Sequence, residues 1–177
     1  MYSDNTLTPK ETVRLCALGT LADEPMNYAN LAGSIRHFID RVQGPSLDVM
    51  GASVELLKYE GLINYDRNSQ NDELLSLTTK GLIELKSLLI ADIKPNDSSL
   101  NKLIEALKFR FMHLLSVNEK LEQTELLIDR LEIELTRLSD LRNYHKNDKG
   151  FLLKWLDRDI AQIKDRLVWL DGINYSL

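Results

Sequence analysis

Residues 100–138, LNKLIEALKFRFMHLLSVNEKLEQTELLIDRLEIELTRL, carry the pattern that decides the architecture. A large apolar residue recurs every seven positions, at Leu100, Leu107, Leu114, Leu121, Ile128 and Leu135. A second row lies three positions further on, at Leu103, Val117, Leu131 and Leu138. Two such rows form a continuous apolar stripe along one side of a long helix. A single helix cannot bury that stripe, so we expect a partner helix from this chain, from a second copy, or from both.

The pattern predicts one long helix over residues 98–142 and a final helix over residues 149–172. The final helix has its own apolar stripe, formed by Leu152, Leu156, Ile160, Ile163, Leu167 and Leu170. Together they predict a helical dimerisation domain over residues 98–177. The predicted dimer contacts are Leu107, Leu114, Leu121, Ile128, Leu135, Leu156, Ile163, Leu167 and Leu170.

Composition sets limits on the class of protein. The 177 residues have a net charge of −5 and include one cysteine, Cys16, which excludes an internal disulfide. The start of the chain lacks the basic and apolar segments of a signal peptide, and no stretch reaches the roughly 20 apolar residues of a membrane span. These observations predict a cytoplasmic protein without a membrane partner.

The N-terminal half begins with strong helix signals. Thr8-Pro9-Lys10-Glu11 combines a capping threonine, a proline at the first helical position and the glutamate of a capping box. This motif predicts a first helix that ends near Leu21. Asn27 can cap a second helix, and Ser46 can cap a third that runs to about residue 60.

The periodicity changes after Gly61, a residue that commonly ends helices. Residues 62–66 and 73–77 are short extended segments, separated by the polar turn formers of residues 67–72. They predict a β-hairpin. Thr78 or Thr79 then caps a fourth helix over about 79–92, and residues 91–99 form a linker around Pro95.

Three helices followed by a hairpin is the order of a winged helix–turn–helix domain, whose third helix can lie in the DNA major groove. The predicted fold is therefore mainly α. A winged-helix DNA-binding domain occupies residues 1–94, and the coiled-coil-like dimerisation arm follows over 98–177.

Three segments resemble PadR-type regulators. Residues 55–63, ELLKYEGLI, are similar to the end of a winged-helix recognition helix, and residues 77–85, LTTKGLIEL, to the return from the wing. Residues 159–170, DIAQIKDRLVWL, resemble the last helix of the PadR dimerisation arm. The resemblance implies a homodimeric transcriptional regulator, most often a repressor, that binds double-stranded DNA. It also implies that a small aromatic ligand can bind at the dimer interface.

DNA binding needs positive charge near the groove, because phosphate contacts supply much of the affinity. The candidate contacts come from the second and third helices, the wing and the residue after it. They are Arg36, His37, Arg41, Ser46, Ser53, Lys58, Arg67 and Lys80. The first 94 residues carry nine basic and thirteen acidic side chains, so an alternative stays open. In that alternative, an acidic winged helix binds protein, as an adaptor or antirepressor.

The sequence gives no indication of an enzyme, a cofactor or a metal site. His37, His113 and His145 are far apart and have no acid or cysteine at ligand spacing. There is no glycine-rich phosphate loop and no nucleophile motif. We interpret the aromatic residues of the C-terminal half, Trp155 and Trp169 among them, as helix packing; a planar-ligand pocket is the alternative.

Overall fold

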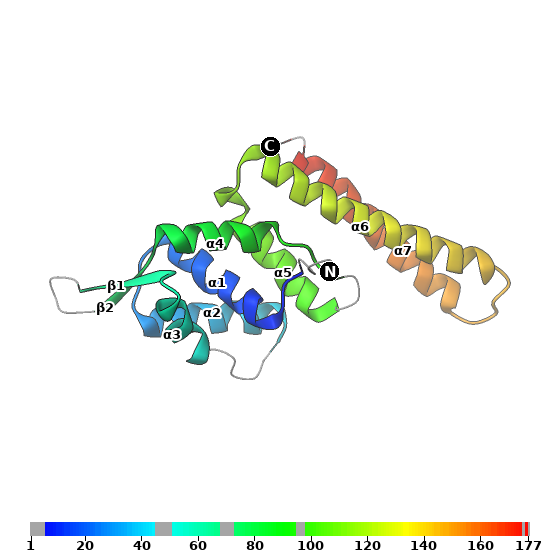
Figure 1. Ribbon diagram of the computed structural model, residues 1–177. Helices are drawn as coiled ribbons and strands as arrows, with labels where there is room; N and C mark the ends of the chain where they lie inside the picture. The colour runs from blue at the N-terminus through cyan, green and yellow to red at the C-terminus, as the bar shows by residue number, and fades with distance from the viewer. Residues whose placement is uncertain (1–5, 45–50, 68–72, 95–97, 175, 177) are drawn as a thin grey trace, which may run out of the picture. The chain divides into compact units, whose positions relative to one another are not determined.

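The computed structural model describes residues 6–44, 51–67, 73–94, 98–174 and 176, with the backbone alone at residues 51–53, 67 and 98. Within these ranges the chain forms seven α-helices and one two-stranded antiparallel sheet. Contacts divide it into two compact units, residues 1–115 and 116–177, which we call the head and the arm (Figure 1). No helix in the described ranges is both long and apolar enough to cross a membrane.

The head has the element order of a winged helix, followed by two α-helices and a short 3-10 helix. Its elements are α1 (Pro9–Asp23), α2 (Tyr28–Val42), α3 (Gly51–Tyr59), β1 (Ile63–Arg67), β2 (Glu73–Leu77), α4 (Thr79–Ile90), α5 (Ser98–Phe111) and a 3-10 helix (Met112–Leu114). The arm consists of α6 (Val117–Tyr144) and α7 (Leu152–Asn174).

The helix starts predicted for α1 and α2 are confirmed. At α1, the Thr8 hydroxyl accepts from the Glu11 amide, and the Glu11 carboxylate accepts from the Thr8 amide at 2.7 Å. At α2, the Asn27 side chain accepts from the Asn30 amide at 2.8 Å. Each cap binds amide groups that the first helical turn leaves without a partner, so these starts are fixed by local sequence.

The predicted β-hairpin is also present, and we call β1 with β2 the wing. The strands pair in a register that places Ile63 opposite Leu77 and Tyr65 opposite Leu75. Met26, between α1 and α2, exchanges backbone hydrogen bonds with Leu75 at 2.8 and 3.1 Å. This bridge ties the wing to the segment between the first two helices.

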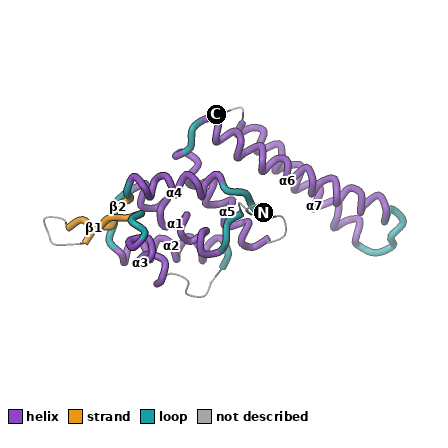
Figure 2. Tube along the Cα trace, viewed as in Figure 1, coloured by secondary structure: helices purple, strands orange, loops and turns teal. Residues whose placement is uncertain are grey.

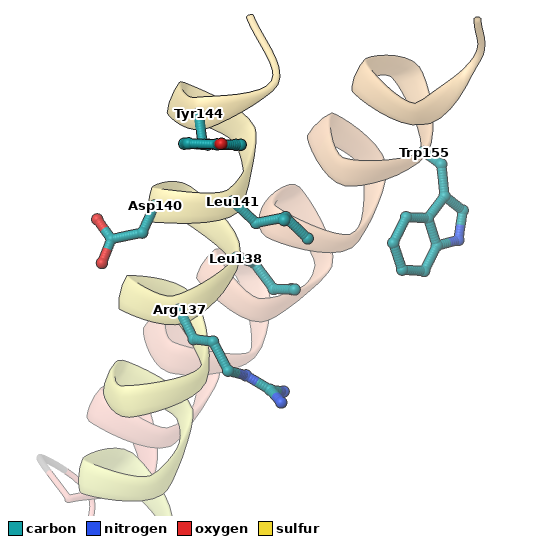
Figure 3. A pocket seen from close by; sticks show the side chains of 6 residues that line it. All are labelled: Arg137, Leu138, Asp140, Leu141, Tyr144 and Trp155. Atoms are coloured by element: carbon teal, nitrogen blue, oxygen red, sulfur yellow. The ribbon is translucent and has the colours of Figure 1, made fainter. Parts of the chain in front are cut away.

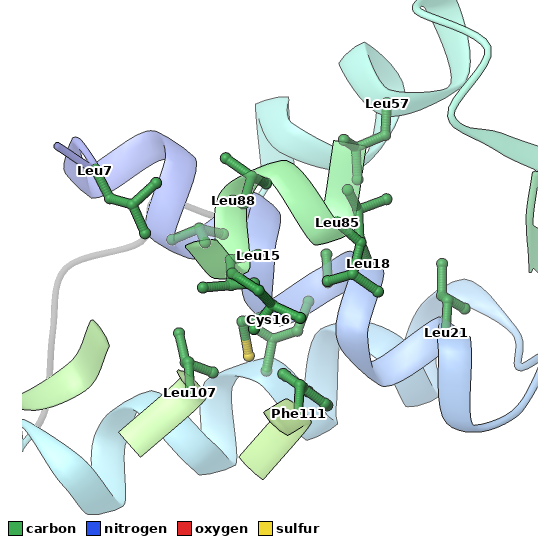
Figure 4. Close-up of a cluster of buried hydrophobic side chains, with 14 of the residues drawn as sticks. Leu7, Leu15, Cys16, Leu18, Leu21, Leu57, Leu85, Leu88, Leu107 and Phe111 are labelled. Atoms are coloured by element: carbon green, nitrogen blue, oxygen red, sulfur yellow. The ribbon is translucent and has the colours of Figure 1, made fainter. Parts of the chain in front are cut away.

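One apolar core holds the head together. Side chains from α1, α2, α3, α4 and α5 contribute to it. Figure 4 shows part of this core, with Leu18, Leu57, Leu85, Leu107 and Phe111 among its side chains. None of these five side chains is more than 1% exposed. Because α3 contributes Leu57, the same core fixes the position of the helix expected to meet DNA.

The prediction of a single helix over residues 98–142 was wrong. α5 ends at Phe111, a 3-10 turn follows, and α6 starts anew after Ser116. The physical reason is burial: the apolar side chains of α5 pack into the head core, from Leu100 to Phe111. Contacts therefore group residues 98–115 with the head, whereas the sequence predicts a division between residues 94 and 98.

A buried lysine joins α5 to the end of α4. Lys108 is 3% exposed, and its ammonium donates to the backbone carbonyls of Leu89 and Ala91, the latter at 2.6 Å. These carbonyls lie at the C-terminal end of α4, where a positive charge is favoured. Burial nevertheless lowers the pKa of Lys108 to about 8, against the opposing effect of Asp92.

The arm is a pair of helices packed side by side along their length, joined by a short connection (Figure 2). The predicted final helix is confirmed as α7, and its inward face is formed by Leu156, Ile160, Ile163 and Leu170. The buried residues of α6 are Leu127 and the polar residues Gln123 and Thr124. Intrachain pairing of α6 with α7 thus buries one stripe of each helix.

Candidate nucleic-acid interface

The outward face of α3 is the natural place to look for a nucleic-acid contact. Val54 and Leu57 face the core, which turns Glu55, Leu56 and Tyr59 outward at helical spacing. Tyr59 is 90% exposed and Leu56 is 47% exposed. The predicted contact Lys58 is also exposed, so the described part of this face carries aromatic, aliphatic, acidic and basic side chains. The predicted contact Ser46 lies outside the described residues.

Two charged residues of α3 are engaged by the wing. The ammonium of Lys58 lies 3.8 Å from the centre of the Tyr65 ring, within the range of a cation–π contact. Glu55 lies close enough to the Tyr65 hydroxyl for its carboxylate to act on it. Burial raises the pKa of Tyr65, and the negative charges of Glu55 and Glu73 raise it further. Tyr65 on β1 thus links α3 to the wing.

The predicted contacts on α2 are exposed, but they do not share one face. Arg36 and Arg41 are five residues apart, which separates them by about 140° around a helix of 3.6 residues per turn. His37 and Arg41 are one turn apart and point the same way. A single DNA surface therefore cannot meet both arginines equally.

The remaining predicted contacts have mixed outcomes. Lys80 is exposed, but its ammonium donates to the backbone carbonyl of Glu60 at 2.8 Å. For Ser53, within α3, and Arg67, at the end of β1, the structure describes only the backbone. Their side chains lie outside the described part of the structure.

An ion-pair cluster beside α3 was missed by the sequence reasoning. The Arg14 guanidinium on α1 lies 2.9 Å from a Glu60 oxygen and 3.0 Å from a Glu84 oxygen. Burial lowers the pKa of Arg14, but the two carboxylates outweigh it and the net shift is upward. The partners are 46 and 70 positions away in the chain, so no local motif marks them.

The described residues contain no cluster of histidine, cysteine or acidic side chains that could hold a metal ion. Cys16 is fully buried, and burial raises the pKa of its thiol to about 11. His113 lies 3.4 Å from Asp23 at the end of α1, a surface contact within the head.

The predicted dimer contacts divide into three groups. Leu107 is fully buried in the head core, so it has no surface left for a second copy, and Leu114 packs beside that core. The contacts predicted on α7 lie on the face that meets α6. They are Leu156, Ile163 and Leu170, which are buried, and Leu167, which is half-buried. Leu121, Ile128 and Leu135 are half-buried along α6 and keep accessible surface.

The arm also exposes large apolar side chains that the heptad rows do not include. Leu126, Ile133 and Tyr144 project from α6, and Trp155 and Trp169 project from α7. Ile133 is 71% exposed and Tyr144 is 85% exposed. Helical spacing places Leu126, Ile133 and Tyr144 along one line of α6, and Trp155 and Trp169, two heptads apart, along one line of α7.

A surface hollow joins these two lines near the connection between α6 and α7. Figure 3 shows Leu138 and Leu141 of α6 between Tyr144 and Trp155, with Arg137 and Asp140 also lining the hollow. Because Tyr144 and Trp155 line the same hollow, the exposed lines of α6 and α7 lie on one side of the arm. We call this the aromatic face, defined by Leu126, Ile133, Tyr144, Trp155 and Trp169.

Comparison with known proteins gives a family. No curated protein matches the chain. The crystal structure of smu.1604c from Streptococcus mutans UA159 is similar, with 17% identity, coverage of 94% of this chain and 98% of that chain, and a TM-score of 0.41. The family described as "Putative AphA-like transcriptional regulator" matches residues 2–174. The chain therefore belongs to the AphA-like family of transcriptional regulators.

Proposed function

We propose that this regulator is a homodimeric repressor that binds double-stranded DNA in the manner of PadR-type proteins. α3 enters the major groove, and the wing contacts the neighbouring backbone. The observation that carries the proposal is the head itself, in which three helices and a wing share one core that fixes α3. A regulator of this kind works in the cytoplasm, which is where we place this protein.

The aromatic face supports the dimer. Monomeric soluble proteins rarely expose large contiguous apolar patches, and aromatic residues are enriched where proteins meet. A second copy would cover Ile133, Tyr144, Trp155 and their neighbours with the same residues of its own arm, as twofold symmetry requires. In such a dimer the hollow beside Trp155 also offers aromatic walls to a small aromatic ligand.

The test starts with a selection from random duplexes, followed by fluorescence anisotropy with the full chain. We expect one enriched, partly palindromic site whose affinity falls steeply between about 50 and 200 mM salt. Absence of duplex binding at low salt contradicts the proposal.

The α2 contacts sharpen this test, because their directions differ. Arg36→Gln and Arg41→Gln are compared singly, with Lys164→Gln on α7 as the charge-matched control. A phosphate contact reduces the salt slope by about one when it is removed. We expect this reduction for one of the two arginines only, because they lie about 140° apart on α2.

One observation favours a second candidate function, the protein-binding winged helix. The described exposed side chains of α3 include Leu56 and Tyr59, and the charge of Lys58 stands beside that of the Glu55 carboxylate. Aromatic and aliphatic anchors of this kind fit a protein surface. If selection enriches no duplex and the wild-type chain stays dimeric and folded, this second function replaces the first.

A further inference from the structure

The C-terminal end of α3 is held by an unusual number of contacts from outside the helix. Gly61 leaves the helix with a φ of +71°, a conformation that favours glycine. The carbonyls of residues 60–62, which come directly after α3, are bound from outside the helix. Glu60 accepts from the Lys80 ammonium at 2.8 Å. The carbonyls of Gly61 and Leu62 share the hydroxyl hydrogen of Thr78, at 2.9 and 3.0 Å from its oxygen.

The backbone at the start of α4 packs directly against this segment. A Cβ at Gly81 would lie 2.1 Å from the Leu62 carbonyl oxygen, so only glycine fits there. Thr78, Lys80 and Gly81 therefore all contact the backbone of residues 60–62, at the end of α3. All three residues belong to residues 77–85, the segment that returns from the wing.

A second set of contacts acts on the Glu60 side chain. Arg14 of α1 binds the Glu60 and Glu84 carboxylates through separate guanidinium nitrogens. The three side chains are only 21–34% exposed, so solvent screens them less than a fully exposed pair. Arginine holds such geometry better than lysine because its planar fork is rigid. Glu60 is thus fixed at both its side chain and its carbonyl.

We propose that Arg14 and Lys80 are positioning residues for α3, which set its angle to DNA through Glu60 without contacting DNA themselves. The proposal rests on the proposed DNA-binding function and changes the role of Lys80, which the sequence suggests as a phosphate contact. Base contacts need hydrogen bonds within a few tenths of an ångström of their best length, whereas contacts to phosphate carry no sequence information. A tilt of α3 therefore reduces specific binding before it reduces nonspecific binding.

The test compares Arg14→Gln and Lys80→Gln in the full chain, with Lys86→Gln on the exposed side of α4 as the charge-matched control. Affinity is measured for the selected duplex and for a scrambled duplex across a salt series. We expect each variant to lose at least about tenfold in affinity for the selected duplex. Affinity for the scrambled duplex, and the salt slope, should match those of Lys86→Gln.

Three results would overturn the inference. A Lys80→Gln salt slope reduced by about one would show a phosphate contact. Equal loss on both duplexes would show that the residue does not act on specificity, and no loss on either would show that α3 does not need it. If Arg14→Gln fails to fold, the exposed Lys80→Gln and the single-partner variant Glu84→Gln carry the test.

The control for the underlying function is the wild-type chain. If the wild type does not prefer any duplex, the proposed function fails and this inference falls with it. If the wild type prefers its site and both variants retain that preference, only the positioning role is lost.

Discussion

Among the described residues, the head buries twenty-six apolar side chains and exposes six large ones, whereas the arm buries five and exposes nine. The head gathers side chains from α1, α2, α3, α4 and α5 into one core. The arm has two helices, so each can bury only the stripe that meets the other. An apolar side chain on the remaining surface can be removed from water only by something outside the arm.

This difference separates two meanings of the same leucine pattern. In α5 the heptad leucines stabilise the head of a single chain, and in α6 they continue onto a surface that a second copy can cover. Substitutions in the head should therefore act on folding, and substitutions in the arm on association.

The largest effect is expected at Leu107, which the heptad row assigns to the dimer and the structure places in the head core. Leu107→Ala should lower the free energy of unfolding by about 2–5 kcal/mol, as cavity-forming changes do. Urea denaturation measures this loss, with Ile83→Ala at an exposed position on α4 as the control. If Leu107→Ala dissociates the dimer and leaves the free energy of unfolding unchanged, Leu107 belongs to the dimer interface and not to the head core.

The second-largest effect is expected in how stability changes with pH at Lys108. Burial lowers its pKa from 10.5 to about 8 in the folded protein, so between those values the unfolded chain binds more protons. Stability from this group is lowest below about pH 8 and rises by about 3 kcal/mol toward pH 10.5. Urea denaturation of wild type and Lys108→Met at about pH 7 and about pH 10 isolates the effect, because other groups cancel. Parallel pH dependence in the two proteins would contradict a buried ammonium.

The arm should respond differently, in association rather than folding. Replacing Trp155 and Trp169 together with alanine removes two aromatic anchors, which should raise the dimer dissociation constant at least about thirtyfold. Sedimentation equilibrium measures the constant, and Val168→Ala, at an exposed position beside Trp169, is the control. If the double variant pairs as tightly as wild type, the aromatic face does not form the dimer.

The smallest effect is expected for an ion pair on the arm surface. Arg142 of α6 pairs with Asp157 of α7 at the arm surface, where their side chains are 40% and 53% exposed. The pair raises the pKa of Arg142 and lowers that of Asp157. Exposed pairs contribute little, because water and salt screen them. Arg142→Gln should leave the urea midpoint unchanged at low and high salt. A clear loss at low salt alone would show that the pair stabilises the arm.

Local signals predicted much of the fold. The caps at Thr8, Asn27 and Thr78 act on amides within three residues, so each could be read from its own segment. The turn at Gly61 and the alternation that follows it were equally local. The wing and the first four helices were therefore accessible to sequence reasoning.

Long-range contacts account for what was missed. Seven-residue spacing from Leu100 to Leu114 fits one continuous helix as well as two, and the spacing alone does not show that α5 is buried against the head. The motif at Ser116 and Glu119 could have revealed the break, because it has the spacing of a capping box. The role of Arg14 could not have been found in this way, because its partners are distant in sequence. The contact of Lys80 was equally hidden, because its partner is a backbone carbonyl.

The capping box at Ser116 has a consequence for how this protein could be rebuilt. The Glu119 carboxylate accepts from the Ser116 amide at 2.7 Å, and the Ser116 hydroxyl accepts from the Glu119 amide at 3.4 Å, so α6 supplies its own first-turn partners. A helix that starts independently does not need the residues before it to nucleate. The chain can therefore be divided between residues 115 and 116. Recombination or design could exchange the arms of two relatives at this position, and each head and each arm would still fold.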